Sequence, residues 1–121
     1  MTEHFSSQEM SCKCGYAYCT AGAMDEGFMV KLERLRVNYG IPMKINSGVR
    51  CPKHNEAIGG SVTSSHLCGM AADISIIGAS ARSDFLGVIY ETKIFTRIGI
   101  AKTFIHVDSD PSKRSKKVWV Y

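Results

Sequence analysis

The chain has 121 residues, an apolar content of 45% and a formal net charge of +4, which fits one globular domain over residues 1–121 with a mildly basic surface. It contains no internal repeat, no low-complexity segment and no apolar run long enough to span a membrane. The first nine residues lack the basic and apolar regions of a signal peptide, so we expect a protein that is made in a cytoplasm without one.

Five cysteines are present: Cys12, Cys14, Cys19, Cys51 and Cys68. An odd number without a secretory signal argues against a full disulfide framework. The first three follow one another closely, but their spacing is not a standard paired zinc spacing. Two interpretations stay open: small buried residues in an N-terminal turn, or a second metal site with thiolate ligands.

The first half of the chain predicts a helix, a strand and a short helix. Apolar residues recur every three or four positions from Met24 to Tyr39, and Gly40 and Pro42 then end the helix. Residues 43–49 are typical of a strand. Residues 52–58 favour a short helix that ends at a pair of glycines.

The second half predicts more strands and one more helix. Residues 72–77 alternate as a strand does, with Asp73 on the face opposite Ala72. A helix follows from Ala81 to about Lys93, and we expect Ser80 to cap it. Residues 98–101 and 103–108 favour a hairpin, and residues 118–121 a last strand. Because strands and helices do not alternate regularly, we predict an α+β fold with a small, largely antiparallel sheet flanked by helices.

The stretch from Ser64 to Asp73 carries the most informative chemistry. It places an imidazole, His66, and a carboxylate, Asp73, seven residues apart and joins them through small residues. Gly69 lets the backbone fold back tightly, so both side chains can face one point. Taken alone, each of these residues is more often a surface histidine or a turn aspartate.

His106 supplies a third candidate ligand from the predicted strand 103–108, where Phe104, His106 and Asp108 share a face. Two imidazoles and one carboxylate suit zinc, and three protein ligands leave a fourth position for water, as a catalytic zinc requires. Zinc lowers the pKa of that water to about 7 and polarises a bound carbonyl. Hydrolysis of a peptide bond is the natural use of such a site.

Several stretches of the sequence match a known family. The pattern Ser-x-His-x-x-Gly-x-Ala-x-Asp from Ser64 to Asp73 resembles the signature of the zinc D-Ala-D-Ala carboxypeptidases and L-alanyl-D-glutamate endopeptidases, which share the hedgehog/DD-peptidase fold. Four other segments look like a subgroup from bacteriophages and bacteria: residues 5–14, 47–60, 104–108 and 119–121. The resemblance covers nearly the whole chain.

The resemblance implies one zinc cofactor held by His66, Asp73 and His106. It also implies a catalytic role for Arg50, which would bind a carboxylate or carbonyl of the substrate, because a planar guanidinium is well suited to such groups. Ser64, the first residue of the matched pattern, is a second candidate for substrate binding. Such a protein would cut a stem-peptide bond of peptidoglycan, either D-Ala-D-Ala or L-Ala-D-Glu. It would reach the bacterial cell wall after release or phage delivery, as an endolysin or tail enzyme does.

One departure from the family concerns the general base. Members usually carry Glu, Asp or His two or three residues before the last zinc histidine, but Phe104 and Thr103 stand there. Asp108 is the nearest candidate for a catalytic role, because it shares a strand face with His106. It could act as the base, or it could orient His106 as carboxylates near metal sites commonly do.

The missing base keeps a second function open, a zinc-stabilised module that binds cell-wall peptide or a protein without turnover. A third interpretation, nucleic-acid binding by the basic residues 113–117, is weaker because aromatic and basic residues are not interleaved. We therefore expect a monomer whose partner is a peptidoglycan stem peptide, with no nucleic-acid and no membrane partner.

Overall fold

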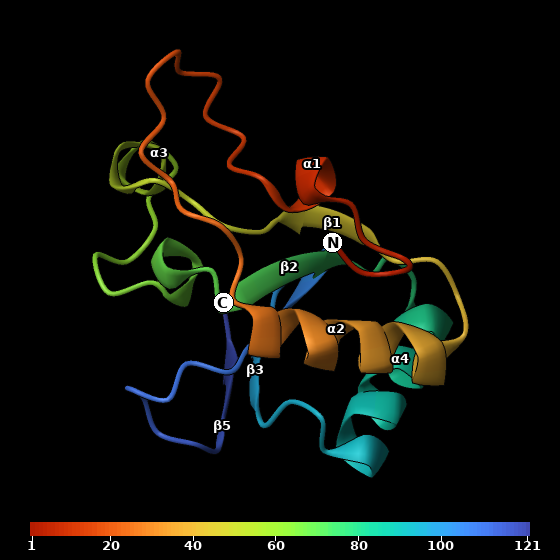
Figure 1. Cartoon of the computed structure of the whole chain (residues 1–121). Coiled ribbons are helices and arrows are strands. Elements are labelled where there is room, and N and C mark those ends of the chain that lie inside the picture. The colour runs from red at the N-terminus through yellow and green to blue at the C-terminus, as the bar shows by residue number, and fades with distance from the viewer.

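A computed structural model describes all residues, Met1 to Tyr121. Figure 1 shows the course of the chain, with one short helix near the N-terminus and the sheet in the middle. The elements, in chain order, are α1 (Ser7–Met10), α2 (Glu26–Tyr39), β1 (Lys44–Ser47), α3 (Pro52–Ala57), the 3₁₀ turn η1 (Ser65–Cys68), β2 (Ala71–Ser75), α4 (Ala79–Thr92), β3 (Arg97–Ile100), β4 (Phe104–Asp108) and β5 (Lys117–Val120).

The strands form one five-stranded sheet in the order β1-β2-β4-β3-β5. Every neighbouring pair is antiparallel except β3 and β5, which run parallel. This arrangement confirms the predicted α+β class with a largely antiparallel sheet. The predicted hairpin is also present, since β3 and β4 pair with each other.

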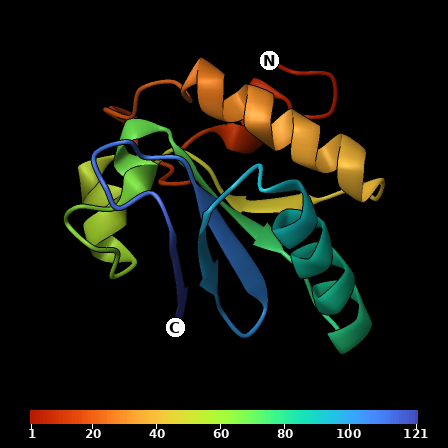
Figure 2. The ribbon, with the colours of Figure 1, turned by 90° about the horizontal axis from the view of Figure 1, so that it is seen from below.

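The core lies on the face of the sheet that α2 and α4 cover (Figure 2). Alternation along β2 and β4 explains the choice of face, because Ala72 pairs with Val107 and Ile74 with Ile105, and all four are buried apolar residues. Phe28 of α2 and Phe85 of α4 pack in the same core. Asp73 lies between Ala72 and Ile74, and His106 lies between Ile105 and Val107, so both point to the opposite face of the sheet.

The long helix α2 ends where the sequence predicts and begins two residues later. The carboxylate of Asp25 accepts a hydrogen bond from the backbone N–H of Phe28 at 2.8 Å, so Asp25 caps the helix and Met24 precedes it. Gly40 closes the helix with a left-handed φ of 75°. Met24 is nevertheless buried, as the apolar stripe predicted.

The predicted cap of the second long helix is wrong. Helix α4 starts at Ala79, and Gly78 rather than Ser80 holds the cap position, with no side-chain hydrogen bond. Gly78 adopts a φ of 98°, which turns the chain out of β2, and its carbonyl already accepts the first helical bond from Arg82. Ser80 consequently lies inside the first turn.

None of the helices combines the length and the apolar character that crossing a membrane would require.

Candidate metal centre

The turn η1 brings His66 to the face of the sheet that the core leaves free. Ser64 caps this turn, because its hydroxyl accepts a hydrogen bond from the backbone N–H of His66 at 3.2 Å. Gly69 ends it with a φ of 71°, and a Cβ there would lie 2.6 Å from the carbonyl oxygen of Ala23. A glycine is therefore needed at this position, both for the conformation and for the close approach of the neighbouring segment.

The register of the sheet places the other two predicted ligands side by side. Asp73 of β2 pairs directly with His106 of β4. Oδ1 of Asp73 lies 2.9 Å from Nδ1 of His106 and 3.2 Å from Nε2 of His66. The structure thus brings together the three residues that the sequence singled out, and all three are buried.

Each histidine uses its other ring nitrogen elsewhere. Nδ1 of His66 donates to the carbonyl oxygen of Gly48 at 2.6 Å, and Nε2 of His106 donates to Oδ2 of Asp108 at 2.8 Å. The nitrogens left over are the two that face Asp73. In the neutral rings these two nitrogens carry lone pairs. Nε2 of His66, Nδ1 of His106 and Oδ1 of Asp73 are then three electron-pair donors that face one point, and a cation at that point can bind all three.

Asp108 is held from two sides. Its Oδ2 accepts from His106, and its Oδ1 accepts from Nε of Arg97 at 2.6 Å in a buried ion pair. The side chain of Asp108 is only 1% exposed. Arg97 was not recognised in the sequence, because its only signal is its cross-strand register with Asp108, which requires the sheet to be known.

Arg50 lies beside the same cluster. Its guanidinium donates to Oδ2 of Asp73 at 3.0 Å, to Oγ of Ser47 at 2.9 Å and to Oδ1 of Asn55 at 3.1 Å. Because Oδ2 of Asp73 is occupied by Arg50, Oδ1 is the oxygen directed at the two histidines.

The environment shifts the pKa values of these groups in opposite directions. Burial lowers the pKa of His66, which favours the neutral ring that a metal needs. Burial by itself would raise the pKa of Asp73, but the adjacent rings of His106 and His66 outweigh it and hold that pKa well below its usual range. Burial would also lower the pKa of His106, yet the carboxylates of Asp108 and Asp73 raise it. Two carboxylates therefore favour positive charge at this point.

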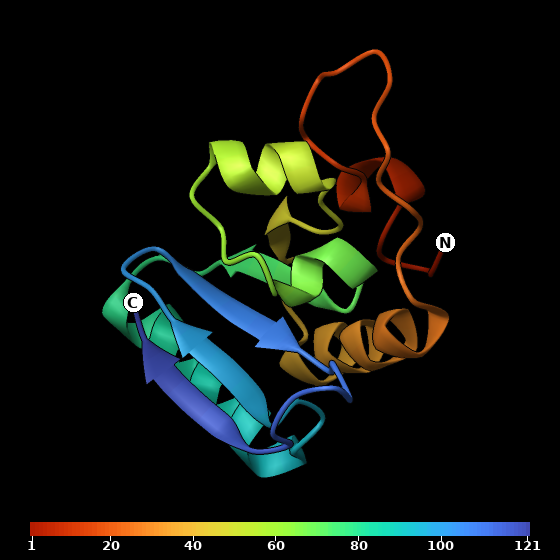
Figure 3. The ribbon, with the colours of Figure 1, turned by 90° about the vertical axis from the view of Figure 1, so that its left-hand side faces the viewer.

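The three candidate ligands line a cavity of about 610 Å³. Arg50, Ser64 and Lys113 line it, together with the aromatic rings of Trp119 and Tyr121. Figure 3 shows β3, β4 and β5 side by side, with the C-terminus at the end of β5. Lys113 belongs to the basic run, and its ammonium group lies 2.8 Å from Oγ of Ser65 rather than free in solvent.

The usual position of the general base offers no proton acceptor in the structure either. Thr103 is exposed, and the half-buried Phe104 packs its ring against Tyr121 with centroids 5.4 Å apart. Apart from Asp73, Asp108 is the only carboxylate among the residues that line the cavity.

Comparison with known proteins gives one family. The model of the family described as Peptidase M15 matches residues 3–108. The matched range includes His66, Asp73, His106 and Asp108, and it stops before Lys113, Trp119 and Tyr121. No curated protein sequence matches the chain.

Proposed function

Since this chain belongs to the M15 family of peptidases and is thereby a metallopeptidase, we propose that it hydrolyses a stem-peptide bond of bacterial peptidoglycan with zinc held by His66, Asp73 and His106. The observation that carries the proposal is the convergence of two imidazole nitrogens and one carboxylate oxygen on a single point, with the remaining nitrogens already bonded elsewhere. Nitrogen and oxygen ligands in this number suit a catalytic zinc.

When bound, zinc supplies a Lewis acid that polarises a carbonyl and lowers the pKa of water to about 7. The protein supplies the orientation. Gly48 and Asp108 fix the two imidazole rings through their second nitrogens, and Arg50 fixes the carboxylate of Asp73. We propose that Asp108 is a positioning residue, because both of its oxygens are already engaged by His106 and Arg97.

The charge of the cavity supports a short acidic peptide as substrate. Three cationic residues line the cavity: Arg97 is paired with Asp108, whereas Arg50 and Lys113 are not. Wall stem peptides carry free carboxylates, which guanidinium and ammonium groups bind well. Arg50 has five N–H donors, and its bonds to Ser47, Asn55 and Asp73 use three of them, so one N–H on each terminal nitrogen remains for a substrate.

The proposed activity predicts that purified protein releases fragments from peptidoglycan in a metal-dependent way. Mass spectrometry of the digest should show either free D-Ala or new N-terminal D-Glu, and the fragment identifies the bond. Chelation should stop the release and added zinc should restore it. If peptidoglycan gives the same fragments with and without the fully zinc-loaded protein, the proposed peptidase activity is contradicted.

That last outcome would favour the second candidate, a zinc-stabilised module that binds wall peptide without turnover. One observation supports this candidate: no carboxylate in the cavity is free of other partners, since Asp73 and Asp108 each use both oxygens. Binding without turnover would appear as co-sedimentation with peptidoglycan that chelation abolishes.

Arg50→Lys tests the substrate role of the guanidinium. We expect hydrolysis to fall at least about tenfold with a smaller effect on folding, because one ammonium group cannot span Ser47, Asn55 and Asp73 and still offer two parallel donors to a substrate. Initial rates on wall peptides measure the first effect, and thermal unfolding measures the second.

Arg82→Lys is the matched control for this variant. Arg82 also uses its two terminal nitrogens, which donate to the carbonyl oxygens of Ile76 and Ala101, but it lies on α4 outside the cavity. We expect this change to affect stability and to leave the rate unchanged. Equal rates for Arg50→Lys and wild type would remove Arg50 from the substrate site.

A further inference from the structure

The segment between α1 and α2 supplies none of the candidate ligands of the metal centre described above. It runs from Ser11 to Asp25 without helix or strand, and residues 12–24 make no backbone–backbone hydrogen bond. Figures 1 and 3 show it as a long arm that projects from the body and passes close to α3. Most of its residues before Ala21 are exposed, so neither the core nor a hydrogen-bond ladder holds that part of the arm in its course.

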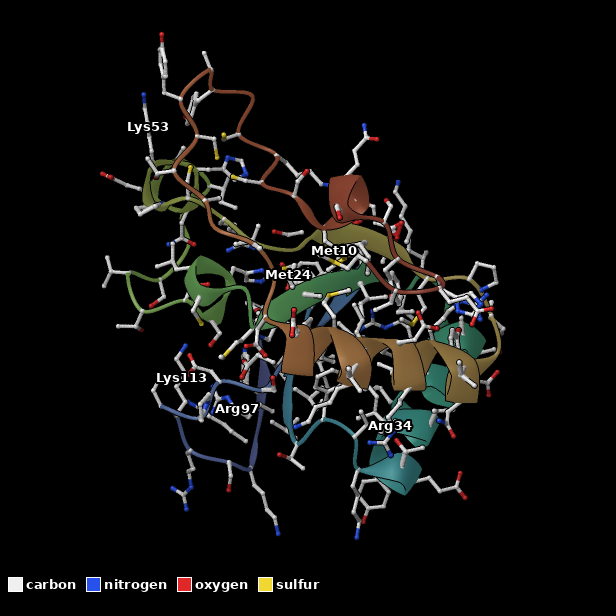
Figure 4. The ribbon with its side chains drawn as sticks, in the orientation of Figure 1. Met10, Met24, Arg34, Lys53, Arg97 and Lys113 are labelled. Carbon is white, nitrogen blue, oxygen red and sulfur yellow. The ribbon has the colours of Figure 1, made fainter.

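Four cysteines join the arm to α3. Cys12, Cys14 and Cys19 come from the arm, and Cys51 is the residue that caps the N-terminus of α3. All four Sγ atoms lie within 4.8 Å of one another. In Figure 4 sulfur atoms gather between the arm and α3, below the labelled Lys53. This convergence from two distant parts of the chain favours the second interpretation of the cysteines, a metal site with thiolate ligands.

The spacing of the sulfur atoms suits a tetrahedral ion. Zinc binds thiolate sulfur at about 2.3 Å, and a regular tetrahedron of that size separates its corners by about 3.8 Å. The four Sγ atoms therefore need to contract by an ångström or less to reach such a shell. All four cysteines are free thiols, so no disulfide accounts for their convergence.

Backbone N–H groups point at three of the four sulfur atoms. The amide of Cys51 donates to Sγ of Cys12 at 3.3 Å, the amide of Tyr16 donates to Sγ of Cys14 at 3.3 Å, and the amide of His54 donates to Sγ of Cys51 at 3.4 Å. Donors of this kind stabilise thiolates more than thiols, because the charged sulfur accepts a stronger hydrogen bond.

We propose that Cys12, Cys14, Cys19 and Cys51 bind a second, structural zinc ion that fastens the arm to α3. Four protein ligands close the coordination shell, so this site has no open position for a substrate. Binding replaces the thiol protons, which leave to solvent, and gives a Zn(Cys)₄ group of charge −2. Lys13 and Lys53 lie next to the ligands in the sequence, and Lys53 also contacts the ring of Tyr16 at 4.4 Å, which ties the same two segments.

The site has a link to the cavity. Cys51 directly follows Arg50, and α3, which Cys51 caps, carries Asn55, the partner of Nη1 of Arg50. A metal that fixes Cys51 therefore also fixes the start of α3 and, through it, the guanidinium beside Asp73. The inference itself rests only on the thiols and stands whether or not the chain is a peptidase.

The test counts zinc in protein purified under reducing conditions and dialysed against a metal-free buffer. We expect two zinc ions per chain in the wild type, one in Cys14→Ser/Cys19→Ser and one in His106→Ala. Cys68→Ser is the matched control, since Sγ of Cys68 bonds to Ser65 and Asp110 and lies outside the cluster, and it should keep two. Cobalt substitution of His106→Ala should give the strong near-ultraviolet absorption of thiolate-to-cobalt charge transfer, and the double serine variant should lack it.

A second measurement needs no variant. Titration of the native wild type with an organomercurial should release one zinc per chain as the four cluster thiols react, in addition to the exposed thiol of Cys68, while the zinc held by histidine stays bound. The proposal is overturned by a native mass that shows a disulfide among these four cysteines, by iron instead of zinc at this site, or by thiol titration that releases no zinc. If the wild type holds only the zinc bound by the cysteines, the proposed peptidase is contradicted and this inference stands.

Discussion

His66→Ala and His106→Ala should each remove the zinc of the peptidase centre and reduce hydrolysis of peptidoglycan to background. Each change deletes one of three converging ligand atoms and leaves Asp73 with one imidazole. Two protein ligands are fewer than catalytic zinc sites use, so the ion should be lost on dialysis. Elemental analysis of the dialysed protein checks the first effect, and the peptidoglycan digest checks the second.

His54→Ala is the matched control, because His54 lies on α3, does not line the cavity and belongs to neither predicted zinc site. It should keep wild-type zinc content and activity. Circular dichroism confirms that each variant is folded before its zinc is counted. If His66→Ala and His106→Ala both keep the full zinc content of the wild type, the assignment of these ligands is wrong.

Asp108→Asn should lower zinc affinity or activity about 10- to 100-fold, the range for carboxylates that orient a ligating histidine. Asn offers one acceptor oxygen where Asp108 offers two, so it cannot accept from both His106 and Arg97. It also leaves the buried charge of Arg97 unpaired, which costs stability. The fold should therefore weaken as well.

Zinc affinity separates the two roles of Asp108. A positioning residue predicts weaker zinc binding, measured by competition with a chelating dye below the unfolding temperature. A general base predicts unchanged affinity and a loss confined to turnover. Asp110→Asn reports the stability cost of the same change at a neighbouring buried aspartate that contacts no histidine. Unchanged affinity and unchanged turnover in Asp108→Asn would exclude both roles.

The candidate ligands could be predicted because they depend on local rules. Alternation alone puts Asp73 on the face opposite Ala72 and Ile74, and places His106 and Asp108 on one face of β4. The sequence cannot show, however, that Asp73 and His106 are register partners, since pairing of β2 with β4 skips an intervening helix and strand. The match to the family signature supplied what periodicity lacks.

The partners of those ligands could not be predicted. Gly48 contributes only its carbonyl oxygen, which any residue carries, and its position beside His66 depends on the approach of two segments. Arg97 contacts Asp108 across β3 and β4, and its sequence neighbours give no hint of a buried ion pair. The misplaced cap at Ser80 has a similar origin, since the positive φ of Gly78 begins the helix earlier.

The position of Trp119 offers a means to observe the cavity directly. It is the only tryptophan of the chain, and its ring lies against His106 with centroids 5.3 Å apart. Gly99 on the neighbouring strand makes this possible, because a Cβ there would lie 2.7 Å from the indole. Intrinsic fluorescence therefore comes from one known point beside the candidate ligands. Titrations of metal or peptide can be followed by its emission in the unlabelled wild-type protein.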